Sequence, residues 1–119
     1  MSIRTVAELM SISARTAPKS AGHDFIVTAI VEGDALQRLG EAMIAFGVRT
    51  GKPNFDRDGR NVLNSAAVLL IGLRDARALG LNCAACGSLT CIQPNTTVGE
   101  FSGPQCAFRL LDMGIAIGS

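Results

Sequence analysis

The four cysteines of this chain lie in one short stretch and are its clearest candidates for chemistry. Their spacing is C-x2-C-x4-C-x14-C, and they are Cys83, Cys86, Cys91 and Cys106. Four thiolates are the usual ligand set of a [4Fe-4S] cluster, with three ligands close in sequence and a fourth returned by the fold. Gly87 tolerates a positive φ, and the small residues around it would let backbone amides approach the cluster sulfides. The spacing predicts an iron–sulfur module over residues 81–108.

Two other interpretations of these cysteines stay open at the level of sequence. A structural zinc site also takes four thiolates, but it more often shows two C-x2-C pairs, whereas fourteen residues separate Cys91 from Cys106. Unligated or disulfide-bonded thiols are the second alternative. Disulfides need an oxidising compartment, and residues 1–20 have no export signal.

The wider sequence supports the cluster interpretation through a resemblance. The segments NCAACGSLTC and GPQCAF resemble the four-cysteine [4Fe-4S] module of corrinoid iron–sulfur proteins and electron-transport subunits. Through ARTAPKSAGHDFIVTAIV, NSAAVLLIGL and CAFRLLDMGIAIGS, nearly the whole chain is similar to a family of ferredoxin-domain-containing proteins of bacteria and archaea. The resemblance implies cluster binding without a particular reaction. It also implies either C-terminal truncation or a shorter relative, because members of that family continue past this point.

Length and composition restrict the class of protein. With 119 residues we expect a single domain, 1–119. A net charge of +1 without a cluster of Lys and Arg argues against nucleic-acid binding. The longest apolar stretch, residues 66–73, is too short to span a bilayer. We therefore expect a soluble, cytoplasmic protein that binds no membrane.

Hydrophobic periodicity predicts an α/β (α+β) fold, with layered helices on a small central sheet and the cysteine module inserted after it. We expect helices over residues 2–16, 34–50 and 104–118 and strands over residues 24–31 and 65–73. Turn-forming residues predict a surface loop over 51–61. If the two strands are parallel, the helix 34–50 is a right-handed crossover between them.

The predicted C-terminal helix is apolar on nearly every face, which is typical of a buried helix. In a monomer its large side chains would lie partly in water: Leu110, Leu111, Met113, Ile115 and Ile117. We therefore expect either a missing segment or a homo-oligomer, most simply a dimer. In a dimer, Gly114 and Gly118 would allow a close crossing of two such helices.

A second resemblance suggests a flavin. Arg15 followed by APKSAG resembles the helix end and small-residue loop of nitroreductase-like flavoproteins, which implies FMN near residues 17–23. The arginine-rich opening of that family is absent, and its Asn and Gln-Pro-Trp are replaced here by His23, Asp24 and Phe25. A helix end and a turn explain the segment without a ligand. No Ser/His/Asp set or Walker motif can be assembled, so hydrolase classes lack support.

The leading hypothesis is a small redox protein that passes single electrons to an unknown partner protein. Backbone amides near residues 87–90 would tune the [4Fe-4S] cluster, and apolar side chains would shield it: Leu89, Ile92, Phe101 and Phe108. One alternative is an oxidoreductase in which the cluster feeds electrons to FMN. The other is a non-redox module whose metal only stabilises the fold.

Overall fold

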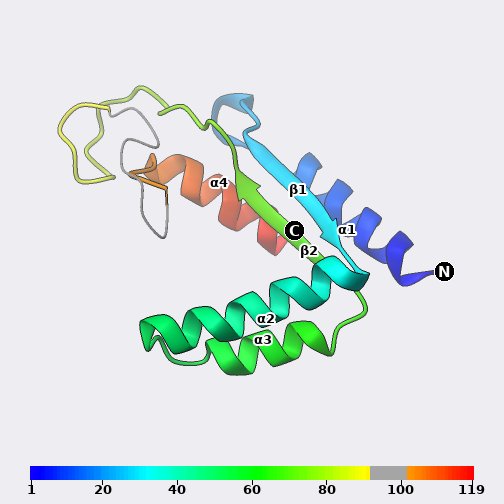
Figure 1. Ribbon diagram of the computed structural model, residues 1–119. Coiled ribbons are helices and arrows are strands. Elements are labelled where there is room, and N and C mark those ends of the chain that lie inside the picture. Colours follow the sequence, from blue (N-terminus) through cyan, green and yellow to red (C-terminus); the bar gives the residue numbers. More distant parts are fainter. Residues whose placement is uncertain (92–101) are drawn as a thin grey trace. The chain divides into compact units, whose positions relative to one another are not determined.

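The computed structural model describes residues 1–91 and 102–119, and it has the mixed α/β (α+β) architecture expected from the sequence (Figure 1). In chain order, the elements are α1 (Ile3–Thr16), the short 3-10 turn η1 (Ser20–Gly22), β1 (Ile26–Val31), α2 (Gly33–Thr50), α3 (Phe55–Leu63), β2 (Val68–Leu73) and α4 (Ala107–Gly118). The predicted helices at 2–16, 34–50 and 104–118 and both predicted strands are confirmed, with ends that differ by up to three residues. Among the described residues, no helix has the length and hydropathy needed to cross a bilayer.

The two strands pair with each other and run in opposite directions (Figure 1). At one end of the pair, the N–H of Arg74 donates to the carbonyl oxygen of Phe25 at 3.0 Å. The right-handed parallel crossover is therefore wrong for these strands. The strands are antiparallel because two helices, not one, connect them: α2 leads the chain away from the end of β1, and α3 leads it back before β2 begins.

The predicted surface loop over residues 51–61 is also wrong, since α3 occupies most of it. Only its first residues are a turn, with Gly51 at φ 69° and Asn54 at φ 73°. Gly59, within the predicted loop, is instead buried within α3. It lies so close to α2 that a Cβ there would be 2.8 Å from the carbonyl oxygen of Gly40. The absence of a side chain at Gly59 therefore allows α2 and α3 to pack closely.

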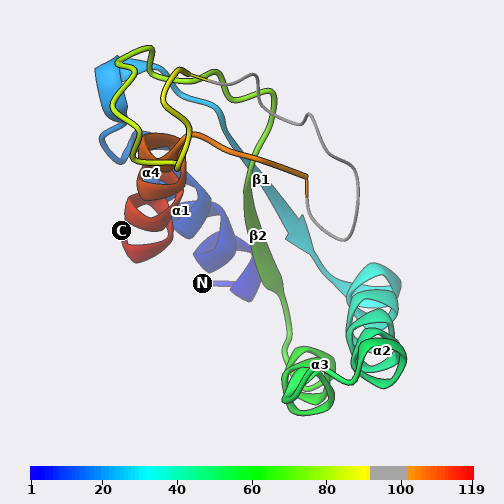
Figure 2. The same ribbon diagram turned by 90° about the vertical axis from the view of Figure 1, so that its left-hand side faces the viewer.

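The chain divides into two compact units. The first consists of Met1–Leu9 and Ala29–Leu70. Its centre is the pair of helices α2 and α3, which lie side by side in Figures 1 and 2. Gly40 and Gly59 allow the helices to approach, and the rings of Phe46 and Phe55 lie 4.7 Å apart.

The second unit consists of Met10–Thr28 and Ile71–Ser119, and it contains all four cysteines. Its core joins α1, β1 and α4 through Ala14, Ala17, Ile26 and Ala116, against which Ile71, Leu73 and Met113 pack. The side chains that meet in this core are mostly small. The larger apolar side chains of α1 recur at helical spacing, yet they are exposed: Val6, Leu9 and Met10.

Replacing Gly59 by Ala should destabilise the α2–α3 pair. The new Cβ would lie 2.7 Å from Cγ1 of Ile44 and 2.8 Å from the carbonyl oxygen of Gly40, and a backbone carbonyl can move only if the helices separate. Overpacking of this kind costs about 1–3 kcal/mol, which exceeds the gain of about 1 kcal/mol in helix propensity. Urea unfolding measures the difference. Asn61→Ala, at an exposed site of the same helix, is the matched control and should not destabilise; equal effects of the two would contradict the prediction.

Candidate metal centre

The structure brings the four predicted cysteines together around one small cavity. Three lie in the segment that follows β2, and the fourth immediately precedes α4 (Figures 1 and 2). The cavity measures about 20 Å³ and is lined by Ala78, Asn82, Cys83, Ala84, Cys86, Ser88, Cys91, Cys106 and Ala107. All four thiols are free, and Cys106 is the least exposed of them. Within residues 1–91 and 102–119, no three His, Cys, Asp or Glu side chains converge closely enough to hold a single metal ion.

Tight backbone turns shape the segment that carries the first two cysteines. Asn82, Ala84 and Gly87 all have positive φ, at 48°, 61° and 95°. The value for Gly87 agrees with the conformational freedom expected of it. Ala84 is strained at its positive φ, because its Cβ crowds the backbone there. The N–H of Gly87 donates to the carbonyl oxygen of Ala84 at 3.0 Å and closes the turn. Strained backbone that is held in place by its surroundings is common at binding sites.

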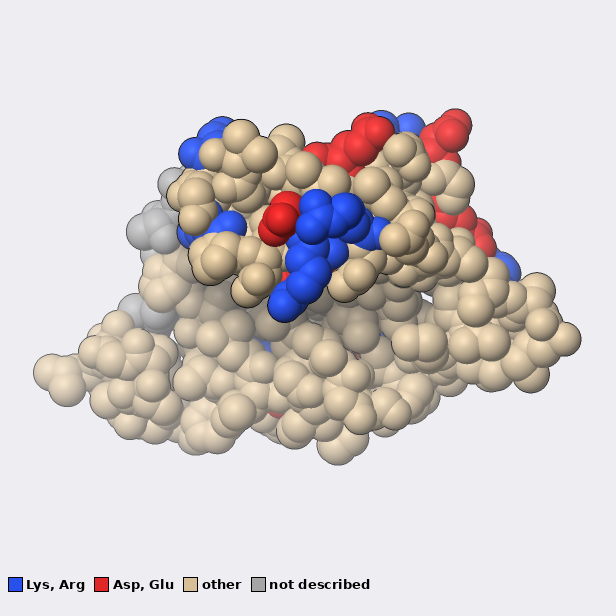
Figure 3. Space-filling view, turned by 90° about the horizontal axis from the view of Figure 1, so that it is seen from below, with Lys and Arg blue, Asp and Glu red and all other residues tan. Residues whose placement is uncertain are grey.

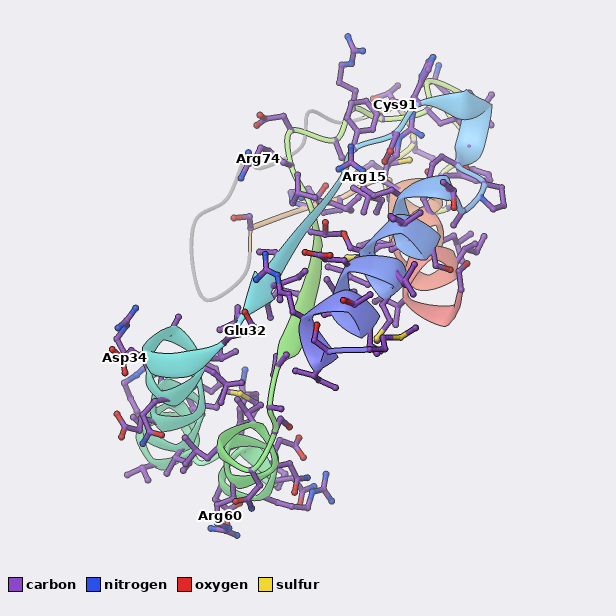
Figure 4. All side chains as sticks on the ribbon, turned by 90° about the vertical axis from the view of Figure 1, so that its right-hand side faces the viewer. Arg15, Glu32, Asp34, Arg60, Arg74 and Cys91 are labelled. Carbon is purple, nitrogen blue, oxygen red and sulfur yellow. The ribbon has the colours of Figure 1, made fainter. Side chains whose placement is uncertain are left out.

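Asn82 closes a larger loop onto the third cysteine. Its backbone N–H donates to Sγ of Cys91 at 3.3 Å, and the N–H of Cys91 donates to Oδ1 of Asn82 at 2.9 Å. The sulfur of Cys91 thus accepts an N–H hydrogen bond, which is one of the factors that set cluster potentials. Figure 4 labels Cys91 in this segment. Sequence reasoning missed Asn82, although its position beside the first cysteine was a usable signal.

Cys106 occupies the position before the first residue of α4, and its surroundings favour the thiolate. Its carbonyl oxygen accepts the N–H groups of Arg109 and Leu110 at 3.0 and 3.2 Å. Burial raises the pKa of the thiol, but N–H groups of Leu79, Phe108 and Arg109 and the charge of Arg109 outweigh this and hold the pKa below its usual value. The thiolate is the form that binds metal.

A buried ion pair on α4 lies behind Cys106. Arg109 is 1% exposed and Asp112 is 3% exposed, and Nη1 of the arginine lies 3.2 Å from Oδ2 of the carboxylate. Asp112 also accepts hydrogen bonds from the N–H and the hydroxyl of Ser20, at 2.9 and 2.7 Å. Burial raises the pKa of Asp112, but the bonds from Ser20 and Arg109 outweigh it and lower that pKa.

Arg109 also reaches beyond its own helix. Its Nε donates to the carbonyl oxygen of Arg77 at 2.8 Å, and its Nη1 donates to the carbonyl oxygen of Ser20 at 2.9 Å. The guanidinium lies 4.8 Å from the ring centre of Phe25. Sequence reasoning missed this network, because the apolar residues on nearly every face of the predicted helix favour burial of aliphatic side chains. The signal was a pair of opposite charges three residues apart, which share one face of a helix.

The buried face of α4 is therefore not the apolar face expected from the sequence. It is formed by Arg109, Asp112 and Ala116. The large aliphatic side chains on the rest of the helix are 46–61% exposed: Leu110, Leu111, Ile115 and Ile117. Of the side chains expected to shield a cluster, Leu89 is 86% exposed in this structure. Phe108 is half-buried, and Ile92 and Phe101 lie outside the described residues.

The segment expected to bind FMN, residues 17–23, uses several of its polar groups internally. Nζ of Lys19 donates to the carbonyl oxygens of Ala14, Arg15 and Ala17 at the end of α1. Ser20 is bonded to Asp112, and the N–H of His23 donates to the carbonyl oxygen of Ser20. These contacts are those of a helix end and a turn.

A larger cavity of about 580 Å³ lies elsewhere in the second unit. Its lining includes Arg74 at the end of β2, labelled in Figure 4, together with Leu73, Asp75, Ser102, Gly103, Gln105, Leu110 and Met113. A cavity of this volume is in the range of small-molecule sites. It shares no lining residue with the cavity of the cysteines.

Comparison with known proteins gives a relative but no activity. No protein-family model matches the sequence, and no solved structure matches it. The chain is 42% identical over 120 residues to a protein of Archaeoglobus fulgidus that is described as an uncharacterized protein. The alignment covers 98% of this chain and 65% of the relative, so the chain spans about two-thirds of the relative's length. That description names no reaction, so the four cysteines and their surroundings are the features that bear on function.

Proposed function

We propose that the chain binds a [4Fe-4S] cluster and acts as a ferredoxin-like carrier of single electrons. The observation that carries this proposal is the convergence of two cysteine-bearing segments on one cavity, with the ligands Cys83, Cys86, Cys91 and Cys106. Each iron of such a cluster takes one thiolate, so the ligands must surround a group of atoms. When bound, the cluster supplies one-electron redox chemistry. A reducing, cytoplasmic setting is part of the proposal, since it keeps the thiols free.

The residues present fit such a group in their chemistry. Four thiols are available, the surroundings of Cys106 favour its thiolate, and an N–H reaches the sulfur of Cys91. The other lining residues are small, apart from Asn82. A cavity of about 20 Å³ has room for little more than one water molecule, so cluster loading requires the segment 82–91 to move outward. The residues of that segment are mostly exposed.

Exposure of the three clustered cysteines favours electron transfer over a purely structural role. Cys83, Cys86 and Cys91 are all exposed. A redox partner protein could therefore approach the cluster from this side. A metal that only stabilises a fold is usually enclosed by its ligands.

Metal and sulfide analysis of anaerobically purified protein tests the proposal. We expect a brown protein with about four iron and four sulfide per chain. Stoichiometric zinc without inorganic sulfide would replace it with a structural zinc site. A flavin absorption band would favour the cluster-and-FMN oxidoreductase. A cluster that resists reduction, and whose loss unfolds the protein, would favour the non-redox module.

We also propose that the protein self-associates through α4. Its aliphatic side chains Leu110, Leu111, Ile115 and Ile117 are largely exposed, and a Cβ at Gly114 or Gly118 would meet no described atom within 4 Å. In Figure 3, wide areas of one face carry neither basic nor acidic side chains. Full burial of such a side chain is worth about 1.5–3 kcal/mol, and a second copy of the helix could recover the part that these half-exposed side chains forgo.

Gly114→Leu should shift a dimer towards monomer. A leucine at the crossing point would hold two helices apart, whereas the fold of one chain has open space there. Size-exclusion chromatography with light scattering at tens of micromolar measures the change. Ala42→Leu, at an exposed site of α2, is the control and should leave the mass unchanged. A wild-type monomer that binds no hydrophobic dye would show that α4 does not self-associate.

A further inference from the structure

We propose that Arg109 is the positioning residue of the four-cysteine site: it holds the segment with the first three cysteines against the helix that follows the fourth, and its buried charge raises the reduction potential of the cluster. The inference rests on the proposed function for its second part. Its first part concerns the chain alone and stands without a cluster.

The contacts of Arg109 join the two segments that supply the ligands. Through its backbone, it donates to the carbonyl oxygen of Cys106 at 3.0 Å. Through Nε, it donates to the carbonyl oxygen of Arg77, six residues before Cys83, at 2.8 Å. One side chain therefore fixes the register between the segment after β2 and the start of α4.

The surroundings of Arg109 keep its position and its charge fixed. The Asp112 carboxylate, the Ser20 carbonyl and the Phe25 ring occupy its other sides, at 3.2, 2.9 and 4.8 Å. Figure 2 shows η1, the segment after β2 and the start of α4 side by side. With 1% exposure, the guanidinium is poorly screened by water, so its charge acts strongly on neighbouring groups.

The sign of the electrostatic effect follows from the charge. Reduction adds one negative charge to a cluster, and a nearby buried cation stabilises the reduced form. Asp112 offsets part of this effect because its carboxylate lies beside the guanidinium. Removing the arginine charge should therefore lower the potential, and removing the aspartate charge should raise it. A loss of packing alone would not produce opposite signs.

Five variants of the cluster-loaded full chain test the charge. Arg109→Gln should lower the midpoint potential by about 59 mV, and Asp112→Asn should raise it by about 59 mV. For a one-electron couple, a shift of this size changes the ratio of oxidised to reduced cluster about tenfold at a given potential. Arg109→Lys keeps the charge and should restore most of the potential. Arg60→Gln and Asp56→Asn remove the same charges from an exposed pair on α3, where water screens them, and should change the potential little. Shifts of the same sign in Arg109→Gln and Asp112→Asn, or shifts no larger than in the exposed pair, would overturn the electrostatic part.

Hydrogen exchange of the metal-free chain tests the clamp separately. Arg109→Gln should accelerate exchange of the amides of Leu79, Asn82 and Cys91 by tenfold or more relative to wild type, while Arg60→Gln should not. Unchanged exchange in Arg109→Gln would overturn the positioning role. If the wild-type protein holds no cluster when iron and sulfide are supplied, the proposed function fails, and the exchange experiment still decides whether Arg109 is a clamp.

Discussion

Cys106→Ser should lose the cluster even though the chain stays folded. A serine oxygen is a hard ligand and a poor substitute for a soft thiolate on iron. Replacing a residue that only contacts the ligands of a metal usually lowers metal affinity by roughly 10–100-fold. Because Cys106 is proposed as a direct ligand, its replacement should lower cluster affinity by more than this. Iron and sulfide content after anaerobic reconstitution, with the visible spectrum, measures the effect.

Two comparisons make the result specific to the ligand. Ser88→Ala changes a hydroxyl on the lining of the same cavity and should retain the cluster. Serine at Cys83, Cys86 or Cys91 should behave like serine at Cys106. If Cys106→Ser alone held a normal cluster, the fourth ligand would lie elsewhere and the x14 assignment would be wrong.

Local chemistry explains why much of this fold could be predicted. Helices α1 and α2 have clear 3.6-residue periodicity, and β2 is a short apolar run of strand length. Spacing also predicted the cysteine group, since two residues between Cys83 and Cys86 and a positive φ at Gly87 are local properties. Such features depend on neighbours in sequence, and they needed no knowledge of the tertiary structure.

The errors arise where tertiary contacts decide. Gly59 and the aspartates around it are ordinary turn residues in sequence, and only the contact with Gly40 of α2 explains a glycine inside α3. Without α3, the direction of β2 could not be deduced. In α4, the apolar content of the sequence predicts a buried aliphatic face, whereas the buried side chains include Arg109 and Asp112. Their partners, Ser20 and Arg77, are remote in sequence, so the pattern of the helix alone could not reveal them.

Asp112→Ala should destabilise the chain by about 3–5 kcal/mol, because it leaves the Arg109 charge buried without its partner. The hydrogen bonds from the N–H and hydroxyl of Ser20 would be lost at the same time. Urea unfolding of the metal-free protein at neutral pH measures this and keeps cluster loss separate. Asp56→Ala, in the exposed pair with Arg60, is the control and should cost about 1 kcal/mol or less.

Acidification should remove the same stabilisation in wild type. The pKa of Asp112 is lowered in the folded chain, so its contribution is present above the unfolded value of about 3.9 and is lost as pH falls through the lower folded value. Asp112→Ala lacks this group and should lose less stability below about pH 4 than wild type does. Parallel pH profiles of the two proteins would show that Asp112 does not titrate with folding.

Replacing both partners should cost much less than replacing one. Arg109→Met with Asp112→Leu removes the charges together and fills most of their volume with apolar atoms, and such exchanges of buried pairs are often neutral or stabilising. The backbone carbonyls of Ser20 and Arg77 lose a donor in the double variant, so we expect a residual cost of about 1–3 kcal/mol. A double variant as unstable as the sum of the single ones would mean that the two side chains act independently, because coupled partners give a non-additive cycle.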